Sequence, residues 1–315
     1  MREAQARGQL HHAWLLSGPQ GVGKRSFVRA WTAALLCENT ASGDAACGVC
    51  SSCQMLASGG HPDAHLLSRD GHLGLAATAT LQADDGLTFW QPKPSSARKE
   101  VVIDAARSLM EKFALAPNRG GHRVVVIMPA EAVNLSTANA LLKTIEEPPA
   151  RTTLIFIAEF AQALPQTIRS RCQQLRFALP EAAASLLWLQ RQRPELTAAH
   201  LQAAGGAPLK ALHWLEQSRF EQLQRWSSLL EQVLQRKANP LMAAADLARE
   251  KSEAGEVLRH WQNLLVAQLR AGQWSVRHEA FRTLLVESLR VVENQNANAT
   301  LALESLLLRW RQLAA

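Results

Sequence analysis

The chain has 315 residues, with 34 Lys and Arg against 27 Asp and Glu, a formal net charge of +7 and 47% hydrophobic residues. This length and composition suit a globular protein of two or three domains. No apolar run reaches the roughly 18 to 20 residues that a membrane-spanning helix needs, and the first ten residues lack the apolar core of a signal peptide. We therefore expect neither a membrane protein nor a secreted one, and we predict a cytoplasmic location. The positive charge suits contact with a polyanion, but it is spread along the chain.

The N-terminal part begins with a pattern of strand, glycine-rich loop and helix. Ala13–Ser17 is a short apolar run typical of a buried strand, Gly18–Lys24 is the loop, and Arg25–Leu36 continues with helical spacing. A cluster of four cysteines follows. The segment Ser68–Ser96 is rich in Gly, Ala, Thr and Pro without periodicity, and we expect most of it to be an insertion or a mobile loop.

Strands and helices then alternate to about residue 178. The patterns predict a helix over Val101–Leu115, a strand over Arg123–Met128, a helix over Asn134–Ile145, a strand over Thr152–Ala158 and a short strand over Leu175–Ala178. Such alternation is typical of a parallel sheet with helices on both faces. The first 178 residues are therefore predicted to form one α/β domain.

The rest of the chain is predicted to be helical, because every later segment carries apolar residues at a spacing of 3.6. A small helical unit is expected over residues 179–217 and a helical bundle over residues 218–315. Asn294–Ala299 is predicted to be a loop, and Thr300 can cap the last helix.

Gly18, Gly23 and Lys24 of the glycine-rich loop match the G-x-x-x-x-G-K part of a phosphate-binding loop, and the strand before it and the helix after it are the expected context. In such loops backbone N–H groups and the helix N-terminus surround the β-phosphate, while the Lys pairs with the β and γ oxygens. The candidate cofactor-binding residues are Gly18, Gly21, Gly23 and Lys24.

Two features indicate that this loop does not support hydrolysis. Arg25 stands where a Ser or Thr hydroxyl would bind Mg²⁺, and Ser26 lies one residue late, about 100° round the helix. Met128 and Pro129 occupy the places where the acids that hold the metal would follow the second strand, and Glu131 is shifted downstream. The sequence predicts weak or absent turnover. It leaves open whether the loop still binds nucleotide or only packs the strand against the helix.

The clustered cysteines Cys37, Cys47, Cys50 and Cys53 have the spacing C-x9-C-x2-C-x2-C. Four cysteines within 17 residues of a chain that we expect to be cytoplasmic predict a structural Zn²⁺ site rather than disulfides. With four thiolate ligands the ion has no open position for water, so we do not expect a catalytic metal.

A third motif is the triplet Ser170-Arg171-Cys172, which ends a polar segment before the last predicted strand. Taken alone, Arg171 is a surface cation. Together with LLKTIEEPP at Leu141–Pro149, the degenerate loop and the four cysteines, however, the triplet resembles the bacterial clamp-loader family of AAA+ proteins in order and spacing. The resemblance covers most of residues 10–180.

Within that family the chain is most similar to the delta-prime subunits of DNA polymerase III. The gamma and tau motor subunits resemble it in the cysteines and the triplet, but they carry a Ser or Thr after the loop Lys and an acidic pair after the second strand. Ala158-Glu159 stands near the polar sensor of the motors, and Leu209, followed by Lys210, stands near their sensing Arg. All four departures indicate loss of hydrolysis.

The resemblance implies that Arg171 is an arginine finger, which acts in trans at the ATP site of a neighbouring subunit. Ser170 and Cys172 would hold the geometry around it, and Cys172 would be a packed thiol rather than a nucleophile. The chain itself would be neither a polymerase nor a competent ATPase, and ATP binding to it is in doubt.

The resemblance also implies three domains: an AAA+ domain over residues 1–178 with its zinc module at 37–53, a lid over 179–217 and a collar over 218–315. Through the collar the chain would join gamma or tau subunits and a delta subunit in a heteropentamer. That complex would load a sliding clamp onto primed DNA.

Two other functions fit the residues less well. One is an active AAA+ ATPase of replication or repair, with Ser26 or water as the Mg²⁺ ligand. The other is a zinc-containing nucleic-acid binding module, which is disfavoured because no Lys or Arg lies between Cys37 and Cys53. Members of the family usually begin a helical turn or more before Gln9–His12, so we expect Met1 to be an internal start.

Overall fold

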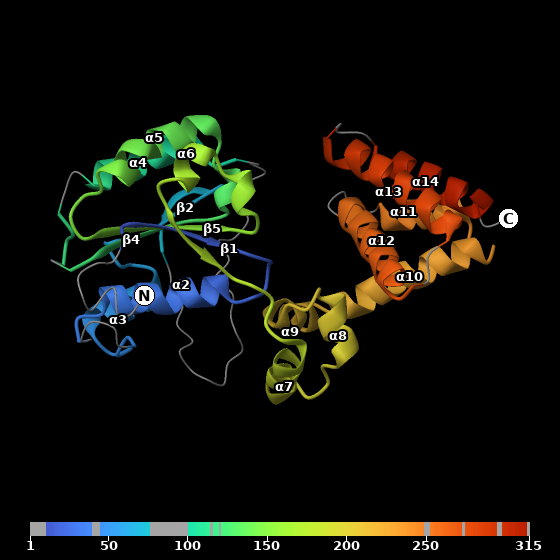
Figure 1. The fold of residues 1–315 in the computed structure, drawn as a ribbon, viewed down its shortest axis with the longest axis horizontal. Helices are drawn as coiled ribbons and strands as arrows, with labels where there is room; N and C mark the ends of the chain where they lie inside the picture. The colour runs from blue at the N-terminus through green and yellow to red at the C-terminus, as the bar shows by residue number, and fades with distance from the viewer. Residues whose placement is uncertain are drawn as a thin grey trace. The chain divides into compact units, whose positions relative to one another are not determined.

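The structure is a computed structural model that describes residues 11–39, 45–75, 100–113, 116–119, 121–248, 253–272, 275–294 and 298–313. The chain divides into two compact units, Met1–His213 and Trp214–Ala315 (Figure 1). Among the helices of the described residues, none is long and apolar enough to cross a bilayer.

The first unit is built on a six-stranded sheet. Its strands are β1 (Ala13–Ser17), β2 (Ala64–Ser68), β3 (Gly71–Gly74), β4 (Arg123–Ile127), β5 (Thr152–Ala158) and β6 (Gln173–Arg176). Their order is β3-β2-β4-β5-β1-β6, and every neighbouring pair is parallel except β2 and β3. The predicted mixed α/β architecture with parallel strands is confirmed.

Helices cover both faces of this sheet (Figure 1). One face carries α2 (Lys24–Leu36) and α3 (Ser51–Ser58), and the other carries α4 (Ile103–Phe113), α5 (Leu135–Glu146) and α6 (Gln166–Arg169). The 3₁₀ turns η1 (Ala130–Ala132) and η2 (Ala161–Ala163) follow β4 and β5.

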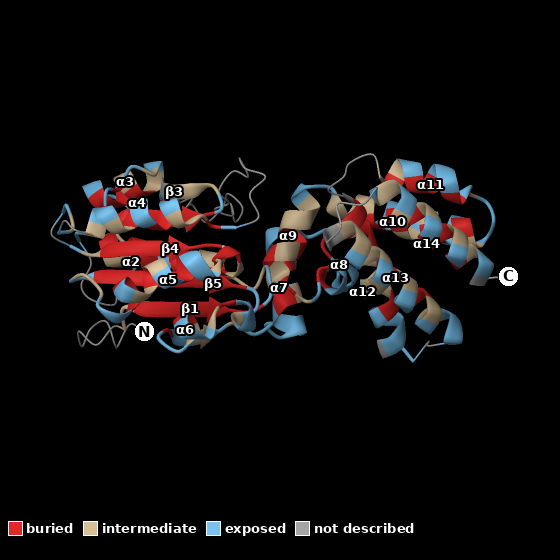
Figure 2. Ribbon diagram, turned by 90° about the horizontal axis from the view of Figure 1, so that it is seen from above, coloured by how far each residue is buried: buried red, intermediate tan, exposed pale blue. Residues whose placement is uncertain are grey.

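Each central strand contributes to two hydrophobic cores, because successive side chains of a strand point to opposite faces. In β1, Leu15 packs with the core under α4 and α5, while Trp14 and Leu16 pack with the core under α2 and α3. Figure 2 shows β1, β4 and β5 buried along their lengths. This double burial explains why the three strands are continuous apolar runs.

The expected insertion Ser68–Ser96 begins with a hairpin, in which β3 pairs antiparallel with β2, and its remainder from residue 76 to 96 lies outside the described residues. The predicted bounds of the last strand are wrong. The last strand is Gln173–Arg176 rather than Leu175–Ala178. It is an edge strand that pairs with β1, so its exposed glutamines can face water and the apolar pattern does not mark its start.

Three helices follow the sheet: α7 (Ala182–Gln192), α8 (Ala198–Ala203) and α9 (Pro208–Glu216). Their buried residues include Leu189, Leu201 and Leu212. The compact first unit extends through most of α9, so these helices belong with the sheet rather than with the C-terminal bundle.

The second unit is wholly helical in its described residues. Its helices are α10 (Arg219–Leu234), α11 (Pro240–Leu247), α12 (Glu253–Arg270), α13 (Val276–Asn294) and α14 (Ala299–Leu313). They share one core centred on Trp261 and Phe281, and the Phe281 ring stacks on Trp310 with 3.9 Å between centroids.

The predicted cap of the last helix is wrong. Asn298 precedes α14, and its side-chain oxygen accepts a hydrogen bond from the backbone N–H of Thr300 at 3.0 Å. Thr300 therefore lies inside the first turn, and Asn, a strong capping residue, takes the role. The predicted loop Asn294–Ala299 is shorter than expected, because Asn294 ends α13 and Ala299 begins α14.

Candidate functional site

The glycine-rich loop lies between the end of β1 and the start of α2, as predicted. Lys24 is buried, and its ammonium donates to the carbonyl oxygens of Gly18 at 2.5 Å and Pro19 at 2.7 Å. Burial lowers the pKa of Lys24, and the neighbouring carboxylates of Glu159 and Glu131 act against that shift. The Lys side chain is therefore folded back onto its own loop.

The start of α9 packs directly against this loop. The backbone N–H of Leu209 donates to the carbonyl oxygen of Gly21 at 3.1 Å. Gly21 has φ +80°, and a Cβ at this position would come within 2.5 Å of the Lys210 Cβ and 2.6 Å of its backbone nitrogen. The Leu209 side chain lies 3.8 Å from where a Cβ of Gly23 would be. Both residues predicted near the sensing Arg thus cover the loop with their own atoms.

Two glutamates lie at the carboxyl ends of β4 and β5, beside the loop. The Glu131 carboxylate accepts hydrogen bonds from the backbone N–H groups of Glu159 and, at 3.1 Å, Phe160. It therefore joins the turn after β4 to the turn after β5. The sequence placed Glu131 downstream of the positions where the metal-holding acids would lie. Its hydrogen bonds give it a structural role instead.

The charge of the Glu159 carboxylate acts on three cationic side chains. Burial lowers the pKa of Lys24, of Arg25 and of Lys210, and the Glu159 charge opposes the shift in each case. The sequence placed Glu159 and Lys210 near sensor positions but not beside one another. The available signal applies only to Glu159 and Lys24, because residues that follow neighbouring parallel strands, here β5 and β1, meet at one edge of the sheet.

The two positions that bind Mg²⁺ in a hydrolysing loop carry side chains without oxygen in this chain, as predicted. Arg25 lies in the first turn of α2, after Lys24, and Met128 is buried directly after β4 with Pro129 following. A guanidinium and a thioether do not bind Mg²⁺, which prefers oxygen ligands.

The four clustered cysteines come together as predicted. One sulfur atom from each of Cys37, Cys47, Cys50 and Cys53 lies within 4.8 Å of all the others. The Sγ atoms of Cys37 and Cys50 are 3.9 Å apart, close to the separation of about 3.8 Å between two ligands of a tetrahedral ion with Zn–S bonds of about 2.3 Å.

Backbone N–H groups point at these sulfur atoms. The N–H of Cys47 donates to Cys37 at 3.3 Å, that of Cys50 to Cys47 at 3.3 Å and that of Cys53 to Cys50 at 3.4 Å. Such bonds stabilise thiolates, so the donor set suits a soft divalent ion.

A polar network that the sequence did not reveal ties the cysteine segment to the sheet. Arg119 donates to Glu38 and to Ser51, both at 2.8 Å. The buried Asp63 accepts from the backbone N–H groups of Asn118 and Arg119 at 2.9 and 3.2 Å. The module is therefore anchored at the start of α3 and just before β2.

Arg171 lies at the surface after α6. Its Nε donates to the Glu146 carboxylate at 2.6 Å, and its Nη1 donates to the Thr167 carbonyl at 3.1 Å and to the Ser170 hydroxyl at 3.4 Å. The side chain is 39% exposed. Glu146, the last residue of α5, was not singled out as a partner by the sequence.

Cys172 is buried in the core under α5 and α6. Burial raises the pKa of its thiol to about 12. The side chain is therefore an inert packed thiol at neutral pH, as predicted.

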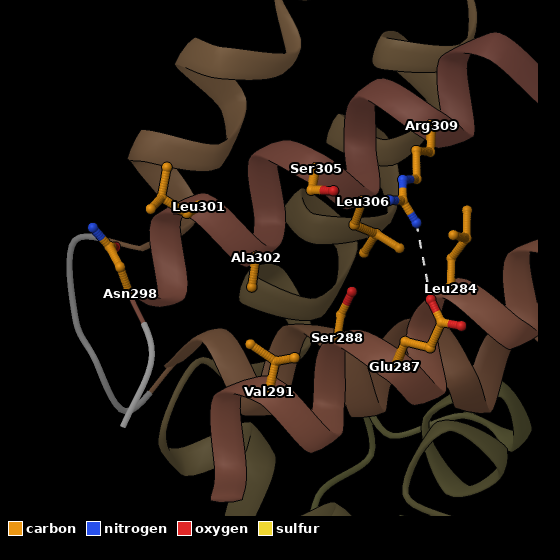
Figure 3. Close-up of a pocket in the computed structure, with 10 residues that line it drawn as sticks. All are labelled: Leu284, Glu287, Ser288, Val291, Asn298, Leu301, Ala302, Ser305, Leu306 and Arg309. Atoms are coloured by element: carbon orange, nitrogen blue, oxygen red, sulfur yellow. Dashed lines mark ion pairs between the residues drawn. The ribbon is translucent and has the colours of Figure 1, made fainter. Parts of the chain in front are cut away.

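A separate hollow of about 360 Å³ lies between α13 and α14 in the second unit (Figure 3). An ion pair between Glu287 and Arg309, 3.9 Å apart, stands at one of its ends, and Asn298 and Leu301 lie at the other. None of the predicted site residues lines this hollow.

Comparisons with known proteins agree with this geometry. A family model described as DNA polymerase III, delta subunit, matches residues 1–181. The chain is 33% identical to DNA polymerase III subunit delta' of Pseudomonas aeruginosa, over 98% of this chain and 94% of that protein. It is 29% identical to DNA polymerase III subunit delta' of Yersinia pestis, over 86% and 75%.

Two further matches come from gamma and tau proteins. DNA polymerase III subunit tau of Salmonella typhimurium is 34% identical over 53% of this chain and 22% of its own length. The solved structure of a DNA polymerase III gamma subunit-related protein from Thermotoga maritima aligns over 100% of this chain and 99% of its own, with a TM-score of 0.53 and 16% identity, which shows a common fold.

Proposed function

The chain belongs to the delta-prime family of DNA polymerase III subunits and is a clamp-loader subunit. We propose that it does not hydrolyse ATP itself. Instead, it supplies Arg171 to the ATP site of a neighbouring subunit. The observation that carries the proposal is the position of Arg171, which is held at the surface, whereas the glycine-rich loop of the same chain is covered by α9. A guanidinium is planar and permanently charged, which suits it to stabilise the charge on a γ-phosphate during transfer.

The absence of hydrolysis is supported by three features of the loop and its surroundings. Arg25 replaces the hydroxyl, Met128 replaces the first acid, and Leu209 bonds to the loop through its backbone. Glu131 is the nearest acid that could substitute, and it is engaged by two backbone N–H groups. We therefore favour a loop kept for packing over one that turns over ATP.

The four cysteines are proposed to hold one structural Zn²⁺. The fit is supported by the sulfur separations and by the N–H groups directed at three of the sulfurs. The bound ion would crosslink the end of α2 to the start of α3 and would have no ligand position for a reactant.

The division into functional domains is also a proposal. We assign residues 1–178 to the AAA+ domain, 179–217 to a lid and 218–315 to a collar. The helices α7 to α9 support the lid, and the separate core of α10 to α14 supports the collar. The proposed partners are gamma or tau and delta subunits in a heteropentamer, with the sliding clamp and primed DNA bound by the whole complex.

The test is reconstitution with gamma or tau subunits whose own Ser-Arg-Cys arginine is replaced by Ala, so that Arg171 is the sole remaining finger. Hydrolysis in this complex should then depend on the present chain. Arg171→Ala should lower the rate of single-turnover hydrolysis by at least about a hundredfold. This lower limit is set below the factor of about 10³ to 10⁵ that an arginine finger contributes to the rate in other systems. Unchanged hydrolysis in an intact complex would refute the assignment of Arg171.

The competing function is an active ATPase, favoured by the proximity of Glu131 and Glu159 to Lys24. The purified chain alone distinguishes the two. Steady-state Mg·ATP hydrolysis that is lost on Lys24→Ala would support the ATPase, and no turnover at any chain concentration would support the proposal.

A further inference from the structure

The ion pair between Arg171 and Glu146 joins the end of α5 to the segment that follows α6. Glu146 is the last residue of α5, and Arg171 follows α6. The two helices lie side by side on one face of the sheet (Figure 1). The Nε–Oε1 distance of 2.6 Å is that of a charge-assisted hydrogen bond.

The position of Glu146 is poor for the stability of its own helix. A negative charge at a helix C-terminus is repelled by the partial charges of the last carbonyl groups. The pair is also open to water, with side chains 39% and 48% exposed, and exposed ion pairs add little to folding stability. A stabilising function therefore does not explain why an acid stands there.

The turn that carries Glu146 is firmly held. Ile145 and Thr144 are buried, and the His12 ring donates to the Ile145 carbonyl oxygen at 2.6 Å. These contacts fix the backbone of the last turn on its inner side. Glu146 extends from this anchored turn toward Arg171.

The backbone on the Arg171 side is held as well. Cys172 is buried in the same core as Ile145 and Ile168, immediately after Arg171. The guanidinium is then contacted at two of its nitrogens, Nε by Glu146 and Nη1 by the Thr167 carbonyl. Because the group is planar, contacts at two nitrogens define the orientation of the whole fork.

We infer that Glu146 is a positioning residue for Arg171: its carboxylate holds the guanidinium in one orientation before a neighbouring subunit presents ATP. The inference rests on the proposed function, since it concerns the same Arg171. Without the carboxylate, the long side chain samples many rotamers and must be ordered during each turnover.

The experiment uses the reconstituted complex in which Arg171 is the only finger. Glu146→Gln keeps the size of the side chain and removes its charge, and it should lower kcat for ATP hydrolysis between about tenfold and a hundredfold, as expected for a misplaced group. The KM for ATP should stay within about twofold, because the group acts in the transition state rather than in binding. Glu147→Gln, the adjacent exposed glutamate, is the matched control and should have no effect.

A structural effect of the substitution is separated by two measurements. Assembly by size-exclusion chromatography and the melting temperature should be the same for Glu146→Gln and Glu147→Gln. In a complex with unaltered motor subunits, Arg171→Ala with Glu146→Gln should hydrolyse ATP at the rate of Arg171→Ala alone. A further loss in this double variant would mean that Glu146 acts apart from Arg171 and would overturn the inference.

Glu146→Asp covers the case in which Glu146→Gln fails to assemble. Asp retains the charge on a shorter stem, so it should keep more activity than Gln if the carboxylate orients Arg171. Equal loss for Asp and Gln would overturn the inference. If Arg171→Ala abolishes hydrolysis while Glu146→Gln has wild-type kcat, only the positioning role fails. If Arg171→Ala has no effect, the proposed function fails and the positioning role fails with it.

Discussion

The backbone N–H of Leu209 donates to the carbonyl oxygen of Gly21, so a backbone–backbone hydrogen bond joins the first turn of α9 to the glycine-rich loop. In a motor subunit the corresponding helix would sense nucleotide through a side chain. Here no side chain or phosphate is needed for the contact, because both hydrogen-bonding groups belong to the backbone. The position of α9 on the loop is therefore built into the fold.

We predict that Gly21→Ala disrupts this contact. An added Cβ would lie 2.5 to 3.0 Å from the Lys210 backbone and Cβ, and φ at Gly21 is +80°. We expect the free energy of unfolding of the first unit to fall by about 2 to 4 kcal/mol, from the strained φ and the clash together. Urea unfolding followed by Trp fluorescence measures it.

Gly205→Ala is the matched control for this prediction. Gly205 has φ +73° but no atom within 4 Å of an added Cβ, so its substitution reports the cost of backbone conformation alone. If the two variants lose equal stability, the close packing of Lys210 on the loop contributes nothing.

The stability of the first unit should fall as the pH drops from about 6.5 toward 4, partly through His65. Burial, together with the charges of His72 and Arg123, lowers the pKa of His65 to about 4. Between this value and the ordinary pKa near 6.5 the unfolded chain binds more protons than the folded one. Protonation then favours unfolding, and His65 contributes up to about 1.4 kcal/mol of lost stability per pH unit.

Unfolding free energies of the wild type and of His65→Gln, measured at several pH values between 7 and 4.5, check this prediction. The variant should show the shallower dependence of stability on pH. An unchanged slope would mean that His65 is not held neutral by burial.

Zinc analysis of the purified chain should find about one ion per molecule. Cys47→Ser should lower the zinc content, and chelation should expose the segment around α3 to proteolysis, since the cysteine sulfurs gather there. Cys172→Ser is the control that should keep its zinc, because Cys172 lies in the core under α5. A folded, protease-resistant chain without metal would contradict the zinc proposal.

The sequence predicted the central strands well and the hairpin poorly, for one physical reason. Strands β1, β4 and β5 are buried on both faces and are therefore continuous apolar runs, which are visible without knowledge of their partners. In the hairpin, His65 in β2 and His72 in β3 are diagonal neighbours, with 3.3 Å between their ring nitrogens. The other ring nitrogen of His72 lies 3.4 Å from the Ser108 hydroxyl of α4, so these contacts are polar and leave no apolar pattern in the sequence.

The sequence indicated the components of the candidate site but not the contacts between them. Residue types identified the loop, the cysteines and Arg171, because their chemistry depends on side chains at fixed spacing. The contacts of Gly21 with Lys210 and of Arg171 with Glu146 join residues far apart in the chain. These contacts depend on how helices pack on the sheet, which local patterns do not determine.

The last prediction concerns Lys24, the residue that a hydrolysing loop could not lose. Its ammonium is bound by the carbonyl oxygens of Gly18 and Pro19, and we propose that no phosphate takes their place during turnover. Lys24→Met keeps the aliphatic stem and removes the charge, so clamp loading by the reconstituted complex should change by less than about twofold. The same substitution in a motor subunit serves as the positive control and should stop loading. If Lys24→Met abolishes loading while the chain still melts at its normal temperature and assembles, then the loop binds nucleotide in the working complex and the passive role proposed for this subunit is wrong.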